Sequence, residues 1–127
     1  METLEREIID LPRGRRGRPP AVVSPHLLSI ERIKDGTVVT LHVRGQLDLN
    51  SVLAFRDAVF SALGERPEQL TVNLSELRAL DSAGISALVT VARVAGLVRT
   101  DLKLVPTPRF RTLLIETGLK RFFTLAA

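Results

Sequence analysis

The chain has 127 residues, of which 45% are hydrophobic and 25% charged, and its formal net charge is +4. This length suits one domain with one core, and no apolar run reaches the roughly 20 residues that a membrane-spanning helix needs. The chain has no cysteine and only two histidines, which excludes disulfides and thiolate metal sites and argues against zinc, so neither a cofactor nor a metal is expected.

The first 26 residues are predicted to form a flexible basic arm. Residues 11–25, LPRGRRGRPPAVVSP, combine arginine, proline and glycine without a hydrophobic period. Residues 1–10 are too short for a stable isolated helix, and their acidic side chains are unlike the start of a secretory signal. The sequence therefore predicts a cytoplasmic protein whose folded domain spans residues 27–127.

The periodicity of residues 27–127 alternates between strand and helix. Strands are expected at 27–33, 37–45, 68–77 and 100–106, with a hairpin turn at the Asp-Gly of residues 34–36. Helices are expected from 52 to 64 after a cap at Asn50 or Ser51, from 81 onward, and from Thr107 and Pro108 to Gly118, before RFFTL docks as a last short element. This order predicts an α/β domain with a mixed, mostly parallel sheet of four to five strands, an N-terminal hairpin, and helices packed mainly on one face.

The stretch LDSAGISAL, residues 80–88, joins a strand to a helix. Asp81 is placed to cap the helix by accepting from the N–H near Gly84, and small residues make the first turn narrow enough to lie close to a sheet. One interpretation is that Asp81 and Ser82 only start the helix. The other is that Ser82 accepts a phosphate, which a helix N-terminus tolerates, while Gly84 leaves the turn open to a partner.

Four pieces of the sequence, in this order, resemble a known family. They are GQLDLNS, the strand LTVNLSEL, the Asp-Ser-Ala-Gly turn, and a helix-strand-helix ending in TGL; the resemblance covers residues 27 to about 123. Together they resemble STAS domains of the anti-sigma factor antagonist type. The resemblance implies that the unphosphorylated protein binds an anti-sigma factor with serine kinase activity and thereby frees a sigma factor. Phosphorylation then breaks this complex, and a separate phosphatase restores it.

The resemblance also implies roles for individual residues. Ser82 matches the phosphoacceptor, Asp81 the acid beside it, Gly84 the turn glycine and Asp48 the aspartate of the neighbouring loop. The expected partner-binding residues are Asp48, Asn50, Asp81, Ser82, Ala83, Gly84 and Ile85. The chain departs from the family pattern at Gln46, where an acid is usual, and at Ala83, where many members have a second hydroxyl; both departures bear on partner choice.

Other interpretations compete with this one. A triad of Ser82, His42 and Asp48 is conceivable, but His42 lies in the middle of a strand and no nucleophile elbow or phosphate loop is present, so no enzyme is expected. The arginines of the arm would give only salt-dependent, non-specific contacts with nucleic acid. A third alternative is a STAS scaffold or accessory subunit without a phosphorylation cycle, as in stress complexes or lipid transporters. Asp48 is expected to cap the first helix or shape its loop, to contact the partner, or to do both.

Overall fold

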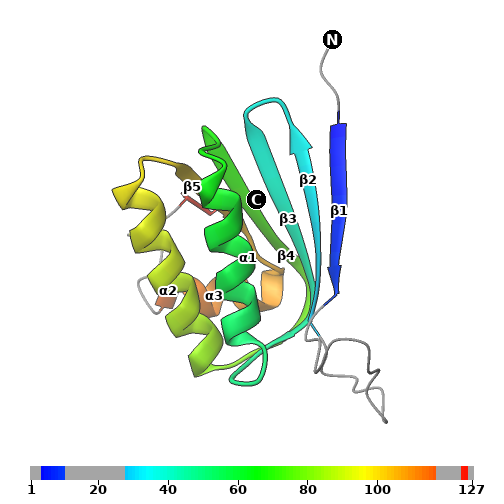
Figure 1. Ribbon diagram of the computed structural model, residues 1–127. Coiled ribbons are helices and arrows are strands. Elements are labelled where there is room, and N and C mark those ends of the chain that lie inside the picture. Colours follow the sequence, from blue (N-terminus) through cyan, green and yellow to red (C-terminus); the bar gives the residue numbers. More distant parts are fainter. Residues whose placement is uncertain (1–3, 11–27, 117–123, 126–127) are drawn as a thin grey trace.

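Six strands form one mixed sheet in sequence order, and three helices accompany it (Figure 1). The computed structural model describes residues 4–10, 28–116 and 124–125. The strands are β1 (Leu4–Asp10), β2 (Ser29–Asp35), β3 (Val38–Leu47), β4 (Gln69–Leu80), β5 (Asp101–Val105) and β6 (Thr124–Leu125); the helices are α1 (Val52–Gly64), α2 (Ser82–Leu97) and α3 (Pro108–Glu116).

The predicted hairpin and parallel strands are confirmed. β2 and β3 pair antiparallel from Asp35 and Val38 outward, and the turn between them contains Gly36 with a φ of 64°. Glycine adopts this left-handed conformation without strain, which is why an Asp-Gly pair favours a tight turn. β3 pairs parallel with β4, and β4 with β5, so α1 and α2 are the crossover connections.

The hydrophobic core lies between the sheet and the helices. Every second residue of β3, and of β4 as far as Leu74, is buried, including Leu41 and Val72, because side chains alternate between the two faces of a strand. Helix α1 places Phe55 against this face, α2 contributes Leu88, and Phe110 of α3 belongs to the same buried cluster. The helices therefore cover one face, as predicted, and α1 and α2 lie side by side on it (Figure 1).

The N-terminal segment differs from the prediction of a flexible arm. Residues Leu4–Asp10 form β1 and pair antiparallel with β2 along its whole length, from Leu4 opposite Asp35 to Asp10 opposite Ser29. The local pattern gave no sign of this, because the pairing depends on the free N–H and C=O groups along the edge of β2. The remainder of the arm, with its arginines, lies outside the described residues and stays a prediction.

The C-terminal part completes the sheet. Thr107 caps α3 as predicted, accepting from the Phe110 N–H at 3.1 Å, and the predicted end of this helix at Gly118 lies outside the described residues. Thr124–Leu125 of the RFFTL segment pairs parallel with β5 as β6. With β1 and β6 the sheet is wider than the four to five strands expected. No helix in the described ranges is long and apolar enough to span a bilayer.

Candidate functional site

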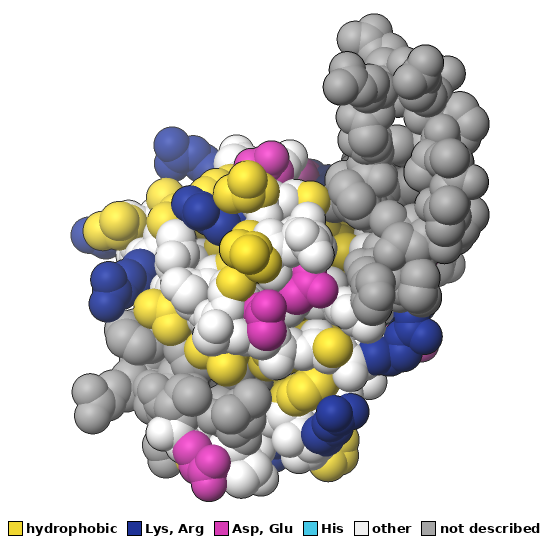
Figure 2. Space-filling model, turned by 90° about the horizontal axis from the view of Figure 1, so that it is seen from below, with side chains coloured by type: hydrophobic (Ala, Val, Ile, Leu, Met, Phe, Trp, Pro, Cys, Tyr) yellow, Lys and Arg dark blue, Asp and Glu magenta, His cyan; other side chains and the backbone are white. Residues whose placement is uncertain are grey.

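Two loops meet where β3 and β4 end. Leu47 and Leu80, the last residues of these strands, are register partners, because the carboxyl ends of parallel strands lie at the same edge of a sheet. The loop of residues 48–51 leads from β3 into α1, and Asp81 leads from β4 into α2. Both helices begin at this end of the molecule, at the bottom of Figure 1, which Figure 2 views directly.

β4 extends further than predicted. The strand was expected to end at residue 77, but it continues to Leu80. Two register shifts in the β3–β4 ladder, between His42 and Arg44 and between Gly45 and Gln46, let the pairing continue. Gly45 has a φ of 103°, a conformation that only glycine adopts readily, so the strand bends at this residue.

The Asp81 carboxylate connects the two loops. One oxygen, Oδ1, accepts from the Gly84 N–H at 2.9 Å, so the predicted cap is confirmed. The other, Oδ2, accepts from the Leu49 N–H at 3.3 Å, and the Asp81 N–H donates to the Leu47 carbonyl at 3.3 Å. A single side chain therefore fixes the start of α2 and holds the neighbouring loop against it.

Gly84 lets α2 approach the strands closely. A Cβ added at this buried residue would lie 2.6 Å from the Leu47 carbonyl oxygen and 2.7 Å from Leu80 Cδ1. Side-chain carbons do not approach other atoms this closely, so any larger residue would push the helix away. The prediction that small residues bring the first turn close to the sheet is confirmed. The expectation that Gly84 leaves the turn open to a partner is wrong, because this buried residue faces the ends of β3 and β4.

The loop of residues 48–51 is held by its own polar groups. The Ser51 side chain is buried, and its hydroxyl donates to the Gln46 carbonyl at 2.8 Å and accepts from the Asp48 N–H at 3.1 Å. Asp48 Oδ1 accepts from the Asn50 N–H at 2.9 Å. Ser51 occupies the predicted cap position of α1 but makes no side-chain bond to the helix. Of the two roles considered for Asp48, the structure confirms the turn.

The predicted site residues differ in exposure. Asn50, Asp81 and Ser82 are exposed, Asp48, Ala83 and Ile85 are half-buried, and Gly84 is buried. Ser82 is the first residue of α2, and within the described part of the chain its hydroxyl has no hydrogen-bond partner. The structure thus brings all seven residues to one end of the molecule and leaves the Ser82 hydroxyl open to a reacting group.

Two exposed leucines at this end of the molecule were not among the predicted site residues. Leu49 is 74% exposed and Leu53 is 67% exposed, in the loop and the first turn of α1. Figure 2 shows hydrophobic side chains interspersed with acidic and polar ones across this end of the molecule. Exposed apolar patches rimmed by polar residues mark protein interaction sites, so these two leucines are candidates for such a surface. Leu53 could have been found from the sequence, because it falls outside the apolar stripe of Val52, Phe55 and Val59.

The arrangement does not support the conceivable triad. His42 lies on the face of the sheet opposite the helices and pairs in register with Asn73, seven residues before Leu80. At about 3.3 Å per residue this places His42 about 20 Å from the strand end that leads to Ser82. Among the described residues there is also no group of three or more His, Asp or Glu side chains placed to hold a metal ion.

Comparisons with known proteins agree with this architecture. The family model described as "Mlab, STAS domain" matches residues 31–125. An anti-sigma factor antagonist from Mycobacterium paratuberculosis is similar in structure, with a TM-score of 0.72 and 23% identity over 82% of this chain and 89% of that one. No curated protein matches the sequence significantly.

Two structures of the anti-sigma factor antagonist SpoIIAA are also similar. The unphosphorylated form has a TM-score of 0.59 and 23% identity, covering 71% of this chain and 80% of that one. The phosphorylated form, from Bacillus, has a TM-score of 0.56 and 22% identity, covering 72% and 84%. At these identities the likeness establishes the fold.

Proposed function

Since the chain belongs to the STAS domain family, whose model matches residues 31–125, we propose that it is an anti-sigma factor antagonist switched by phosphorylation of Ser82. The observation that supports this most directly is an exposed serine hydroxyl at the start of α2 that has no hydrogen-bond partner among the described residues, at the same end of the molecule as two exposed leucines. Similar structures are described as anti-sigma factor antagonists, and one of these proteins was solved with and without its phosphate.

The start of α2 can accept a phosphate without rebuilding. The Gly84 N–H donates to the Asp81 side chain and the Ile85 N–H to the Asp81 carbonyl, whereas the N–H groups of Ser82 and Ala83 have no partner in the described part of the chain. These two groups and the positive end of the helix dipole favour an anion. Phosphorylation therefore affects partner binding and the adjacent loop, and the fold itself is retained.

A phosphate on Ser82 would weaken partner binding in two ways. It adds about −1.5 to −2 charges to a surface that already contains Asp48 and Asp81. At a contact distance of roughly 4 Å, repulsion between the phosphate and the Asp81 carboxylate amounts to about 2 kcal/mol in water. This repulsion opposes the bond from the Leu49 N–H to Asp81, and so loosens the loop that presents Leu49.

The partner in this proposal is an anti-sigma factor with serine kinase activity. The docking surface of this chain consists of Leu49, Leu53 and those predicted partner-binding residues that are exposed or half-buried: Asp48, Asn50, Asp81, Ser82, Ala83 and Ile85. The kinase binds the unphosphorylated chain and releases its sigma factor, a phosphoserine phosphatase resets the cycle, and the chain is a substrate and not an enzyme. A coupling of about 1 to 3 kcal/mol between phosphorylation and binding changes affinity by about 5- to 150-fold, enough for a switch.

Calorimetric titration of the chain with purified anti-sigma factors tests this proposal. We expect Ser82→Asp to bind at least 5-fold more weakly than the wild type, and Ser82→Ala to bind normally but to lose its response to ATP. Ser86→Asp is the matched control, because Ser86 is also exposed but lies one helical turn further along α2. Equal weakening by the two aspartate substitutions would show that general charge, and not the Ser82 position, governs binding.

A second candidate function is an accessory subunit without a phosphorylation cycle, acting in a transport complex. The matching family model is described as a STAS domain and not as an antagonist, which is compatible with this function. The same docking end of the molecule would then bind a transporter subunit permanently. Affinity capture of the tagged chain distinguishes the two: the switch predicts loss of the captured partner with Ser82→Asp, and the accessory role predicts that a transporter subunit is retained.

A further inference from the structure

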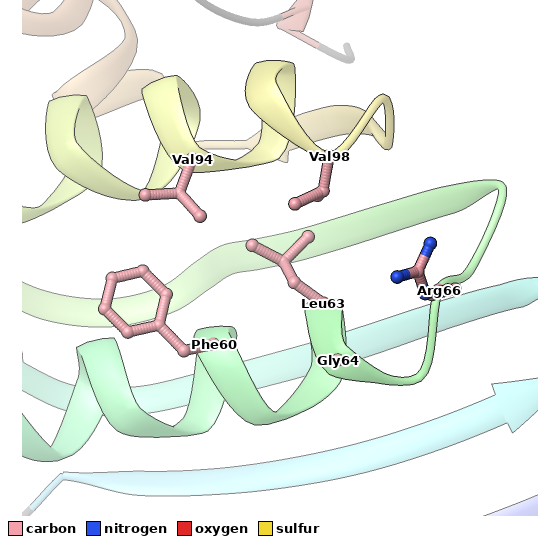
Figure 3. A pocket seen from close by; sticks show the side chains of 6 residues that line it. All are labelled: Phe60, Leu63, Gly64, Arg66, Val94 and Val98. Carbon is pink, nitrogen blue, oxygen red and sulfur yellow. The ribbon is translucent and has the colours of Figure 1, made fainter.

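A groove separates the C-terminal halves of α1 and α2. Its volume is about 260 Å³, and it is lined by Phe60, Leu63, Gly64, Arg66, Val94 and Val98. Figure 3 shows the four apolar side chains facing one another across the space between the helices, with Arg66 at one end. Ser82 lies at the opposite end of α2 from the groove. Because α2 has 16 residues, its two ends are about 24 Å apart.

The groove is apolar and is not filled by the contact between the two helices. Phe60 and Val94 are half-buried and Val98 is 49% exposed, so these side chains still face solvent. A Cβ added at Gly64 would meet no atom within 4 Å, so space is open beside that glycine as well. An apolar ligand that displaces water from such a surface binds favourably, and ligand sites are mostly apolar with a few placed polar groups.

Arg66 supplies a positive charge at the mouth of the groove. It is exposed, and its side chain has no hydrogen bond or ion pair within the described part of the chain. The acid beside it, Glu65, is already engaged by Arg32 and Lys34. The backbone N–H groups of Glu65 and Arg66 satisfy carbonyls of the last turn of α1, at 3.1 and 3.0 Å, so the Arg66 side chain is not needed there.

A second arginine adds to the positive character of this region. The Arg56 guanidinium lies over the Phe60 ring, 5.7 Å from its centroid, one turn before the groove. Its Nε is buried and has no hydrogen-bond partner among the residues that the structure describes. The apolar groove therefore has the Arg66 guanidinium at one end and the Arg56 guanidinium close to Phe60. A ligand that enters the groove should for this reason carry a negative charge.

We propose that this groove binds a small monocarboxylic acid with an apolar tail. The tail would lie against Phe60, Leu63, Val94 and Val98, and the carboxylate would accept hydrogen bonds from the Arg66 guanidinium, whose planar donors match a carboxylate. One water molecule occupies about 30 Å³ in the liquid, so the groove volume of about 260 Å³ corresponds to about nine water molecules, or to a similar number of ligand heavy atoms. This corresponds to an acid of about eight carbons, with its carboxylate at the mouth.

Titration of the ¹⁵N-labelled chain with sodium octanoate, followed by amide chemical shifts, tests the proposal. We expect saturable shifts at Phe60, Gly64 and Val94 with a Kd of about 6 mM, since a ligand of about ten heavy atoms at about 0.3 kcal/mol each gains about 3 kcal/mol on binding. 1-Octanol, which has the same tail without the charge, should bind about fivefold more weakly. Equal affinities for the acid and the alcohol, or shifts elsewhere only, would overturn the proposal.

Two arginines of the chain form a matched pair of variants. Arg66 and Arg99 each follow the end of a helix with a left-handed φ, 56° and 61°, but only Arg66 lines the groove. We expect Arg66→Gln to weaken octanoate about fivefold and to leave octanol unchanged, whereas Arg99→Gln should bind both as the wild type does. Equal effects of the two substitutions would refute the assignment of the carboxylate to Arg66. Val94→Trp, at a half-buried position, should fill the groove and abolish binding of both probes.

Discussion

Replacing Gly84 with alanine tests whether close contact between α2 and the strand ends holds the site together. The added Cβ would lie 2.6 Å from the Leu47 carbonyl oxygen and 2.7 Å from Leu80 Cδ1. Leu80 can rotate away, but the Leu47 carbonyl is held in place by the Asp81 N–H and cannot yield. The start of the helix must therefore move, which costs about 1 to 3 kcal/mol for one methyl group in a packed site.

The expected net effect includes the better helix propensity of alanine. Because that gain is at most about 1 kcal/mol, Gly84→Ala should lower the free energy of unfolding by about 1 to 2 kcal/mol. Gly96 is the matched control, since it lies in the same helix and a Cβ there would meet nothing within 4 Å. Gly96→Ala should raise the free energy of unfolding by about 0.5 to 1 kcal/mol.

Thermal and urea unfolding followed by circular dichroism measure both changes; the chain has no Trp or Tyr for intrinsic fluorescence. We expect Gly84→Ala to lower Tm by about 5 °C and Gly96→Ala to raise it by about 3 °C. If Gly84→Ala is as stable as the wild type, or if the two substitutions shift Tm in the same direction, the contact between α2 and the end of β3 is not as tight as the structure indicates.

Three further substitutions address the loop and the docking surface. Asp81→Ala removes the acceptor for the Gly84 and Leu49 N–H groups and should lower the free energy of unfolding by about 1 to 2 kcal/mol in urea titrations. Ser51→Ala removes the two hydrogen bonds of the buried Ser51 hydroxyl, to the Gln46 carbonyl and from the Asp48 N–H, and should cost about 1 to 3 kcal/mol in the same assay, whereas Ser61→Ala on the exposed face of α1 should change stability by less than about 0.5 kcal/mol. Leu53→Gln should leave Tm unchanged but weaken binding to the anti-sigma factor about tenfold or more in calorimetric titrations; normal binding would remove Leu53 from the docking surface.

Local signals in the sequence were sufficient for most elements of the fold. The Asp-Gly turn predicted the hairpin, the apolar period of Phe55 and Val59 predicted α1, and Thr107 with Pro108 predicted the start of α3. The cap at Asp81 was also predicted, because its side chain accepts from the N–H of Gly84, only three residues further along the chain. Each of these features depends on residues close together in the chain.

The features that the sequence did not reveal depend on contacts between distant segments. β1 forms because residues 4–10 pair with β2, and β4 reaches Leu80 because shifts in the ladder keep it paired with β3. The second bond of the Asp81 carboxylate joins residues 32 positions apart, which no local pattern encodes. The groove between α1 and α2 likewise arises from how two helices pack, and not from the sequence of either one.

Intact-mass analysis and site mapping after incubation with ATP and purified anti-sigma factor kinases test the central claim most directly. We expect a single added phosphate on Ser82, none in the Ser82→Ala variant, and none on Ser86, which is exposed one turn further along the same helix. A phosphate on another residue, or no phosphate with any of the kinases while circular dichroism shows a folded chain, would contradict the switch and leave Asp81 and Ser82 with the structural role of starting α2.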